Sequence, residues 1–264
     1  MDLQLKDKCA LVTGGSRGIG FYTATALAQE GCNLAICARG GDTLQESGEK
    51  LRGLGVKVVD IQADVCAEDD CQRVIDTCIS ELGALDILIN NAGGASGGGL
   101  TDSSDDDWRE TYELNVFAAV RLIRMATPHM KGRPGASVVN VSSISGWSPP
   151  LGGFPQYGSS KASLIFLGES LALQLVKDGI RVNTVSPGSV IWDDSGWDNY
   201  RKSDSEAFAA YERDGFPMGR LGKPDEIADV ITFLASPRSN WINGRNIAVD
   251  GLEQPVPVAK YRFH

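Results

Sequence analysis

Long apolar runs are missing from this 264-residue sequence. A membrane-spanning helix needs about 18 or more consecutive apolar residues, and no such stretch occurs. The first residues, 1–8, mix acids with bases and contain no apolar segment, so they do not resemble a secretory signal. We therefore expect a cytoplasmic protein that does not bind membranes.

Basic residues are outnumbered as well. Twenty-five Lys and Arg stand against 34 Asp and Glu, which gives a formal net charge of −9. A negative field repels the phosphate backbone of nucleic acids and argues against general nucleic-acid binding. It still permits a local basic pocket for one phosphorylated small molecule.

Histidine is nearly absent, since only His129 and His264 occur, and no metal site is expected. None of the cysteines forms a C-x-x-C pair, and all lie in the first third of the chain. We expect them to be reduced packing residues rather than disulfides or zinc ligands. They are Cys9, Cys32, Cys37, Cys66, Cys71 and Cys78.

Short apolar runs alternate with helix-length segments along the chain. Strands are expected at 9–13, 33–37, 56–62, 87–90, 137–141, 181–185 and 246–249. Helices are expected near 18–29, 42–53, 68–82, 105–130, 155–177 and 224–235. This alternation predicts an α/β fold in which a doubly wound parallel sheet of about seven strands carries helices on both faces. No repeat or linker divides the chain, so residues 1–264 should form a single domain.

Three segments depart from the alternation. Residues 93–99 are glycine-rich and should form a flexible loop. Residues 189–217 carry many aromatic side chains, which indicates either a lid over the substrate or a contact between subunits. Residues 252–264 should form a C-terminal arm against another subunit or a frayed terminus.

A glycine-rich turn follows the first expected strand and opens a helix. Glycines let the backbone approach a pyrophosphate, and the N-terminus of the helix offers unpaired N–H groups. The turn therefore predicts a dinucleotide site, with contacts from Gly14, Ser16, Arg17, Gly18, Ile19 and Gly20.

The same residues also match G-x-S-x-G, as Gly14-Gly15-Ser16-Arg17-Gly18, which is the nucleophile elbow of α/β-hydrolases. A serine hydrolase needs a histidine on a later loop. His129 instead falls inside an expected helix, and His264 is the last residue. A hydrolase is therefore a remote alternative.

The residues after the second strand bear on cofactor choice. An acid there would hold the ribose hydroxyls of NAD, but the sequence has Ala38 and Arg39. Arg39 and the nearby Arg17 suit a 2′-phosphate better, although either could be a solvated surface charge. NADP(H) is the preferred cofactor, and NAD(H) is possible.

Tyr157 and Lys161 lie four residues apart, so they should share one face of a helix. An ammonium about 4 Å from a phenol is worth roughly 4 kcal/mol at an effective dielectric near 20, which bounds the lowering of the phenol pKa at about three units. Tyr157 could then exchange protons near neutral pH. Ser143, at the end of the fifth strand, could hydrogen-bond a substrate oxygen as charge builds there.

Together these motifs resemble the classical short-chain dehydrogenase/reductase family over nearly the whole chain. The matching pieces are Thr13–Gly20, Asp64-Val65, Asn90-Asn91-Ala92-Gly93, Asn115, Asn140-Val141-Ser142-Ser143, Tyr157 with Lys161, Asn183, Pro187-Gly188, Arg220–Pro224 and Asp250-Gly251. The resemblance implies a Rossmann fold and hydride transfer between a nicotinamide and a ketone or secondary alcohol.

The resemblance also implies a role for each matching residue. Tyr157 would be the general acid and base, Lys161 would also bind the nicotinamide ribose, and Asn115 would hold a water on the proton path. Further cofactor contacts are implied for Asp64, Val65, Asn91, Gly93, Gly188 and the backbone of Val190. A homotetramer or dimer is implied as well.

The sequence departs from the family pattern at Trp192, where a threonine usually bonds the nicotinamide. The substrate pocket should be lined by Ser143, Tyr157, Trp147, Pro149, Pro150, Leu151 and the aromatic residues of 189–217, including Trp192. This composition favours an apolar or ring-bearing small-molecule ketone or alcohol. A 3-oxoacyl-[acyl-carrier-protein] reductase is the alternative, with Arg121, Arg124 and Lys131 as a possible carrier surface. A non-catalytic dinucleotide-binding module is disfavoured because both Tyr157 and Lys161 are present.

Overall fold

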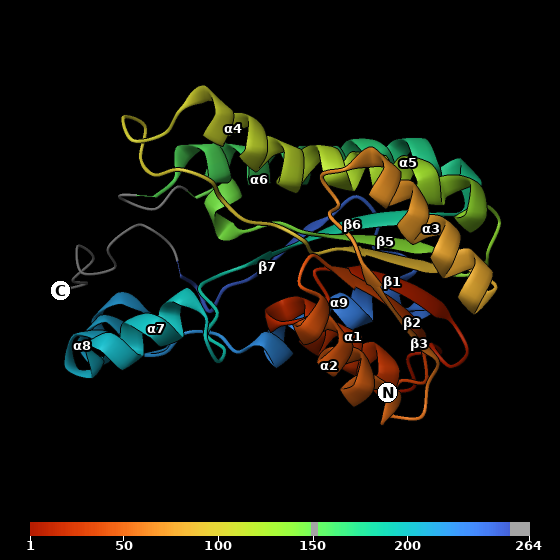
Figure 1. Ribbon diagram of the computed structural model, residues 1–264, viewed down its shortest axis with the longest axis horizontal. Helices are drawn as coiled ribbons and strands as arrows, with labels where there is room; N and C mark the ends of the chain where they lie inside the picture. The colour runs from red at the N-terminus through yellow and green to blue at the C-terminus, as the bar shows by residue number, and fades with distance from the viewer. Residues whose placement is uncertain (149–152, 254–264) are drawn as a thin grey trace.

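The fold is a single parallel sheet with helices on both faces. A computed structural model describes residues 1–148 and 153–253 of the chain (Figure 1). The strand order is β3-β2-β1-β4-β5-β6-β7, and every neighbouring pair is parallel. The strands are β1 (Cys9–Thr13), β2 (Asn33–Ala38), β3 (Val58–Gln62), β4 (Ile87–Asn90), β5 (Ser137–Val141), β6 (Arg181–Pro187) and β7 (Asn246–Val249). The predicted fold class is confirmed.

Two layers of helices cover the sheet (Figure 1). One face carries α1 (Gly18–Gln29), α2 (Gly41–Arg52) and α9 (Pro224–Ala235). The opposite face carries α3 (Glu68–Leu82), α5 (Ala118–Met130) and α6 (Pro155–Leu175), with α4 (Asp105–Tyr112) beside α6. Short 3-10 turns lie at Ile144–Gly146, Val176–Asp178 and Pro237–Ser239.

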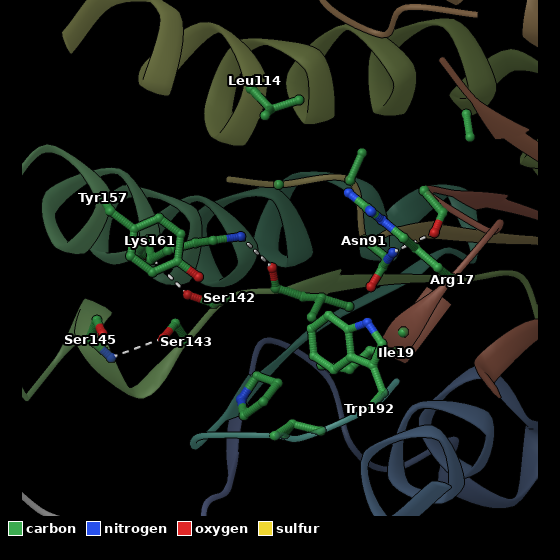
Figure 2. A pocket seen from close by; sticks show the side chains of 18 of the residues that line it. Arg17, Ile19, Asn91, Leu114, Ser142, Ser143, Ser145, Tyr157, Lys161 and Trp192 are labelled. Carbon is green, nitrogen blue, oxygen red and sulfur yellow. Dashed lines mark hydrogen bonds between the residues drawn. The ribbon is translucent and has the colours of Figure 1, made fainter. Parts of the chain in front are cut away.

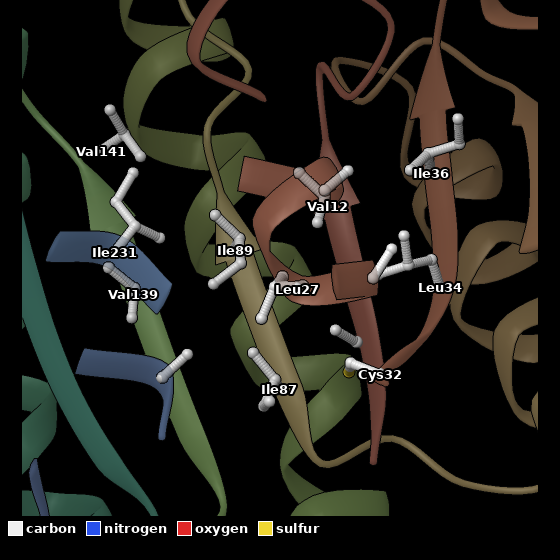
Figure 3. Packing of buried hydrophobic residues seen from close by; sticks show 14 of the residues in the cluster. Val12, Leu27, Cys32, Leu34, Ile36, Ile87, Ile89, Val139, Val141 and Ile231 are labelled. Atoms are coloured by element: carbon white, nitrogen blue, oxygen red, sulfur yellow. The ribbon is translucent and has the colours of Figure 1, made fainter. Parts of the chain in front are cut away.

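The strands place alternate side chains in separate hydrophobic clusters. Val12 of β1 packs with α1, α2 and α9, whereas its neighbour Leu11 packs with α3 and α5. Figure 3 shows the first cluster, in which Leu27 and Ile231 reach the sheet from their helices. Because both faces of the sheet are covered, the central strands β1, β2 and β4 are mostly apolar, and this explains why the sequence predicted them so closely.

The cysteines serve as packing residues in the described part of the chain. Five of the six are buried, and all are free thiols. Burial raises the pKa of Cys37 and Cys78 to about 12 and of Cys71 to about 11. Such thiols remain protonated at neutral pH.

The expected continuous helix over 105–130 is wrong in one detail. A π-helical segment, Glu113–Phe117, separates α4 from α5. It contains Asn115, whose side chain bonds both the loop after β4 and α6. The sequence missed the wider turn because one extra residue barely disturbs the apolar pattern of a long helix.

Two helices form within the aromatic segment 189–217. They are α7 (Gly196–Ser203) and α8 (Ser205–Gly215), and they extend to one side of the main body (Figure 1). Phe208, Phe216 and Leu221 form a small hydrophobic cluster with Ile191 and Trp197. These helices therefore have a core of their own beside the carboxyl ends of the strands.

Among the described residues, no helix has both the length and the apolar character required to cross a membrane. Residues 254–264 of the expected C-terminal arm lie outside the described part of the chain, as do Pro149, Pro150 and Leu151.

Candidate active site

A cavity of about 940 Å³ opens at the carboxyl edge of the sheet. It is formed by the turns that follow β1 to β6 and by residues of α6, α7 and α8. Ligands of doubly wound sheets bind at this edge, where the connections of the strands diverge. The cavity holds the glycine turn at one end and Tyr157 at the other.

The glycine turn is held by an amide from the neighbouring strand connection. Asn91 Nδ2 donates to the carbonyl oxygens of Thr13 (2.9 Å) and Gly14 (3.2 Å). A Cβ atom on Gly20 would lie 2.2 Å from the Gly14 oxygen and 2.4 Å from Asn91 Nδ2, so only glycine fits there. Gly20 therefore shapes the turn and does not line the cavity, and Asn91 supports the turn as well as lining the site.

Two arginines stand at the glycine-turn end of the cavity. Arg17 precedes the first residue of α1, and Arg39 follows β2. Both are exposed and line the cavity, and neither forms an ion pair with the residues that the structure describes. The first N–H groups of α1 lack helical partners and face an anion-binding position.

Backbone groups of Val190 face the cavity. Val190 forms an isolated parallel bridge with Gly222, in which Ile191 N–H donates to the Gly222 oxygen and Gly222 N–H donates to the Ser189 oxygen. In such a bridge the N–H and C=O of the central residue point the other way. Val190 thus presents one donor and one acceptor to a ligand.

Trp192 stands where the resemblance implies a threonine. Its indole ring lies against Gly18, because a Cβ atom there would be 2.9 Å from Trp192 Cε2. Figure 2 shows the ring beside Ile19, at the middle of the pocket. Trp192 therefore packs against the glycine turn and lines the cavity on that side.

Tyr157 and Lys161 project from α6 toward the end of β5 (Figure 2). Lys161 Nζ lies 5.6 Å from the centre of the Tyr157 ring and donates to the Val141 carbonyl (2.9 Å). Gly93 makes room for the ammonium, since a Cβ atom there would lie 2.8 Å from Nζ. Ser143, two residues after the end of β5, faces the same space, and its Oγ accepts from Ser145 N–H (3.1 Å).

The expected lowering of the Tyr157 pKa is not found. Burial raises the pKa of the phenol above its ordinary value, and a hydrogen bond with the Ser143 side chain offsets part of the rise. Burial also lowers the pKa of Lys161 to about 8. The reason is that Lys161 bonds the Val141 carbonyl and not the phenol, while burial penalises both charged forms. Tyr157 is thus a protonated acid at neutral pH.

Asn115 is buried behind the site. Its Nδ2 donates to the Gly94 carbonyl (2.7 Å) and to Ser160 Oγ (3.0 Å), and its Oδ1 accepts from Gly94 N–H (3.1 Å). It does not line the cavity, but its Oδ1 lies 2.9 Å from where a Cβ atom of Gly93 would be. Asn115 therefore joins the loop after β4 to α6 close to Lys161.

Most of the predicted site residues come together. The cavity is lined by Gly14, Ser16, Arg17, Gly18, Ile19, Arg39, Asp64, Val65, Asn91, Gly93, Ser143, Tyr157, Lys161, Gly188, Val190 and Trp192. Trp147 does not line it, because the 3-10 turn Ile144–Gly146 leads the chain outward and leaves its side chain 46% exposed.

The hydrolase alternative finds no support in the described residues. Ser16 lines the cavity, but His129 is exposed near the end of α5 and is not part of the lining. No histidine of the described chain is therefore placed to activate Ser16.

Sequence reasoning missed Glu253 as a lining residue. It follows the closing Asp250-Gly251-Leu252 motif, in a tail where an acid is ordinarily a solvated charge. Trp197 and Tyr211, which the aromatic segment did suggest, line the cavity as well.

The sheet, the glycine turn and the Tyr157–Lys161 pair define a dinucleotide-binding oxidoreductase. Residues 14–251 match a family model described as enoyl-(acyl carrier protein) reductase. The chain is 32% identical to dehydrogenase/reductase SDR family member 4 of Caenorhabditis elegans over 253 residues, covering 94% of this chain and 95% of the relative.

Two solved structures are similar to the chain over nearly its whole length. L-sorbose reductase from Gluconobacter frateurii, complexed with NADPH and L-sorbose, has a TM-score of 0.88 at 33% identity, covering 95% of this chain and 98% of that one. A 7α-hydroxysteroid dehydrogenase complexed with NADH and 7-oxo glycochenodeoxycholic acid has a TM-score of 0.88 at 29% identity, covering 97% and 98%. The chain belongs to the short-chain dehydrogenase/reductase family and is an oxidoreductase of carbonyl and CH–OH groups.

Proposed function

We propose that this protein is an NADP(H)-dependent oxidoreductase that interconverts a ketone and a secondary alcohol, with Tyr157 as the general acid and base. The observation that carries the proposal is one cavity that contains both the glycine turn and the side chains of Ser143, Tyr157 and Lys161. The substrate is an apolar or ring-bearing small molecule.

The residues present fit a dinucleotide. The unpaired N–H groups of α1 suit a pyrophosphate, and the amide and carbonyl of Val190 suit a carboxamide. The volume of about 940 Å³ lies near the upper end of small-molecule pockets and leaves room for a substrate beside the cofactor. Asp64 and Val65 line the cavity, and the resemblance implies that they would contact the adenine.

NADP(H) is supported by charge. Arg17 and Arg39 reach the same end of the cavity, and the residue after β2 is not an acid. Two guanidinium groups match a phosphate better than a ribose diol. One similar structure binds NADPH and another binds NADH, so the preference rests on these two side chains.

The bound nicotinamide would supply or accept a hydride. Ser143 would donate a hydrogen bond to the substrate oxygen, and Tyr157 would transfer its phenolic proton to the same oxygen during reduction. The raised pKa of Tyr157 keeps that proton on the phenol at neutral pH.

Lys161 would hold the nicotinamide ribose hydroxyls and return protons to Tyr157. Its pKa of about 8 lets it exchange protons near neutral pH. Asn115, joined to Gly94 and Ser160, would hold a water that connects Lys161 with solvent.

The test is Tyr157→Phe, assayed with NADPH and NADH against ketones, acetoacetyl thioesters and ring diketones. Removing the proton donor should lower kcat by about a thousandfold, within the range for a general acid, while dinucleotide binding by calorimetry stays unchanged. The matched control is Tyr22→Phe, a tyrosine that is 41% exposed on α1 and does not line the cavity. Full turnover by the Tyr157 variant would contradict the mechanism.

The acyl-carrier alternative has less support. The three cations on α5 and beside it are paired with acids: Arg121 with Glu113, Arg124 with Glu68, and Lys131 with Asp178. Paired cations are less available to an acidic carrier protein. The thioester arm of the assay tests this alternative directly.

The segment 189–217 is proposed as a substrate lid, since its Trp197 and Tyr211 line the cavity. A homo-oligomer, a tetramer or a dimer, is proposed as well. It is supported by Phe166 and Leu173, which lie seven residues apart on α6 and are 73% and 77% exposed.

A further inference from the structure

We propose that Glu253 determines substrate specificity by accepting a hydrogen bond from a hydroxyl group of the substrate, so that the enzyme selects uncharged, hydroxyl-bearing ring ketones and alcohols. This inference rests on the proposed function, because it names a substrate class for the same cavity. It assigns a task to an acid that the reaction itself does not use.

Glu253 is held in place by Ser189. Ser189 Oγ donates to Glu253 Oε1 (2.7 Å), and the Ser189 N–H donates to Oε2. The turn after β7 brings the acid there, since Glu253 N–H donates to the Asp250 carbonyl (2.9 Å). Gly188 leaves the space, because a Cβ atom on it would lie 2.7 Å from Oε2. The carboxylate therefore has a fixed position on the cavity wall.

The carboxylate retains the capacity to accept further hydrogen bonds. An ionised carboxylate offers about four acceptor sites and no donor, and Ser189 uses one site on each oxygen. Glu253 is half-buried, and it forms no ion pair with any residue in the described ranges 1–148 and 153–253. A partly buried acceptor without a cation is best satisfied by a donor on the ligand.

The wall beside Glu253 is aromatic. The rings of Trp197 and Tyr211 stack with centroids 5.4 Å apart and planes 17° from parallel, and both line the cavity. Burial and the negative charge of Glu253 both raise the pKa of Tyr211, as expected for a phenol near the carboxylate. An apolar surface next to a fixed acceptor fits a ring that carries a hydroxyl group.

The local charge disfavours anionic substrates. Within the described chain, the cations that line the cavity are Arg17 and Arg39 at the glycine turn and Lys161, which is buried. Asp250 adds a second negative charge beside Glu253; burial raises the pKa of Glu253, and the charge of Asp250 adds to the rise. A substrate carboxylate would meet repulsion there and no counter-ion.

A hydroxyl group suits this acceptor better than an ammonium does. The two donors of Ser189 already compensate part of the carboxylate charge. A hydroxyl group adds a further hydrogen bond at a lower desolvation cost than a full cation.

The test compares four ring ketones that differ only at the position opposite the carbonyl: cyclohexanone, 4-hydroxycyclohexanone, 4-aminocyclohexanone and 4-oxocyclohexanecarboxylate. We expect the wild type to prefer the hydroxyl compound over cyclohexanone by about tenfold in kcat/KM, the size of one hydrogen bond to a charged group, and to turn over the carboxylate most slowly. Glu253→Leu should abolish the hydroxyl preference by raising KM for the hydroxyl compound about tenfold more than KM for cyclohexanone.

Two further variants sharpen the test. Glu253→Gln retains an acceptor but removes the charge, so it should keep most of the hydroxyl preference and accept the carboxylate compound more readily. Glu206→Leu removes an exposed acid of α8 that does not line the cavity, and it should change nothing. If Glu253→Leu lowered kcat/KM equally for the hydroxyl compound and for cyclohexanone, the proposal would be overturned. A wild-type preference for the amino compound over the hydroxyl compound would overturn it as well.

A binding assay separates this inference from the proposed function. The protein is titrated with cyclohexane-1,4-diol or with cyclohexanol, and the change in its tryptophan fluorescence gives the Kd of each alcohol without turnover. Tighter binding of the diol that is lost in Glu253→Leu supports the specificity role even if no ketone is reduced, in which case the proposed function fails. If the wild type reduces the ketones but does not distinguish the hydroxyl compound from cyclohexanone, the specificity role of Glu253 is overturned and the proposed function stands.

Discussion

The two ends of the cavity are built in different ways. The end proposed for the dinucleotide, called the dinucleotide end below, consists of short turns after β1 to β4, and its geometry is set by close backbone contacts such as Gly20 against Gly14. The end proposed for the substrate, called the substrate end below, collects side chains from distant segments: Ser143 after β5, Trp197 and Tyr211 from α7 and α8, and Glu253 after β7. The close backbone contacts of the dinucleotide end leave little room for substitution. The side chains of the substrate end come from separate segments, so each can be replaced without moving the others.

The helices at the substrate end are stabilised mainly by themselves. Asp198, fully buried in α7, pairs with Arg201 and Lys202 of the same helix, and the aromatic rings of α7 and α8 pack on one another. This region therefore depends little on the two main hydrophobic clusters. Substitutions there should alter substrate choice without unfolding the sheet.

Two glycines in helices, Gly20 of α1 and Gly196 of α7, should respond to alanine in opposite ways. Gly20→Ala places a Cβ atom 2.2 Å from the Gly14 oxygen, so it should lower the free energy of unfolding by about 3 kcal/mol and weaken dinucleotide binding at least a hundredfold. Gly196→Ala at the start of α7 meets nothing within 4 Å and should stabilise by up to about 1 kcal/mol. Urea unfolding and calorimetry measure both effects.

Helix propensity alone predicts that both alanines stabilise the protein. A Gly20→Ala protein as stable as the wild type would show that the glycine turn can adjust, and the contrast between the two ends would disappear.

A charge reversal tests the dinucleotide end separately. Arg39→Asp should shift the ratio of kcat/KM values from NADPH toward NADH by about tenfold or more, because it removes a charged hydrogen bond to the 2′-phosphate and adds repulsion. The preference among ring ketones should stay the same. Arg109→Asp, on an exposed helix position away from the cavity, is the control. Unchanged cofactor discrimination would remove Arg39 from the site.

The smallest expected effect concerns Lys161, where the two ends meet. Its pKa is about 8 in the folded protein and 10.5 when unfolded, so the unfolded chain holds more protons between these values and stability should rise with pH. From pH 8 to 9 the free energy of unfolding of the wild type should increase relative to Lys161→Met by at most about 1.4 kcal/mol.

Urea titrations at several pH values measure this difference. The buried thiols also change the pH dependence, because they titrate in the unfolded chain, but they do so equally in both proteins and cancel in the comparison. The control is Lys177→Met at an exposed lysine, for which the free energy of unfolding should change with pH as it does in the wild type. If the free energy of unfolding changed with pH in the same way for Lys161→Met and for the wild type, the pKa of Lys161 would not be lowered in the folded protein.

The sequence predicted the fold class, and most of the residues that it proposed for a dinucleotide line one cavity. Central strands such as β1 are apolar runs, and the glycine turn, Arg39, Tyr157 and Lys161 are each encoded within a few residues. One strand start differed: β3 begins at Val58 and not at 56, because the apolar pattern extends past the hydrogen-bonded ladder.

The substrate end was predicted less completely. Glu253 could not be assigned, because its contact with Ser189 joins residues 64 positions apart. Trp147 was placed in the pocket by its closeness to Ser143 in sequence, and a single 3-10 turn reverses that expectation. The phenol pKa was misjudged because one partner of Lys161, the Val141 carbonyl, is visible only in three dimensions.

The π-helical segment Glu113–Phe117 also sets the rotation of α4. Each residue of an α-helix advances about 100° around the axis, so the one additional residue of the wide turn rotates everything before it by that angle. Deleting one residue there would restore a regular helix and swing Thr111, whose Oγ1 accepts from Ser96 N–H (3.0 Å), away from the loop after β4. The one additional residue therefore determines which side of α4 contacts the loop after β4.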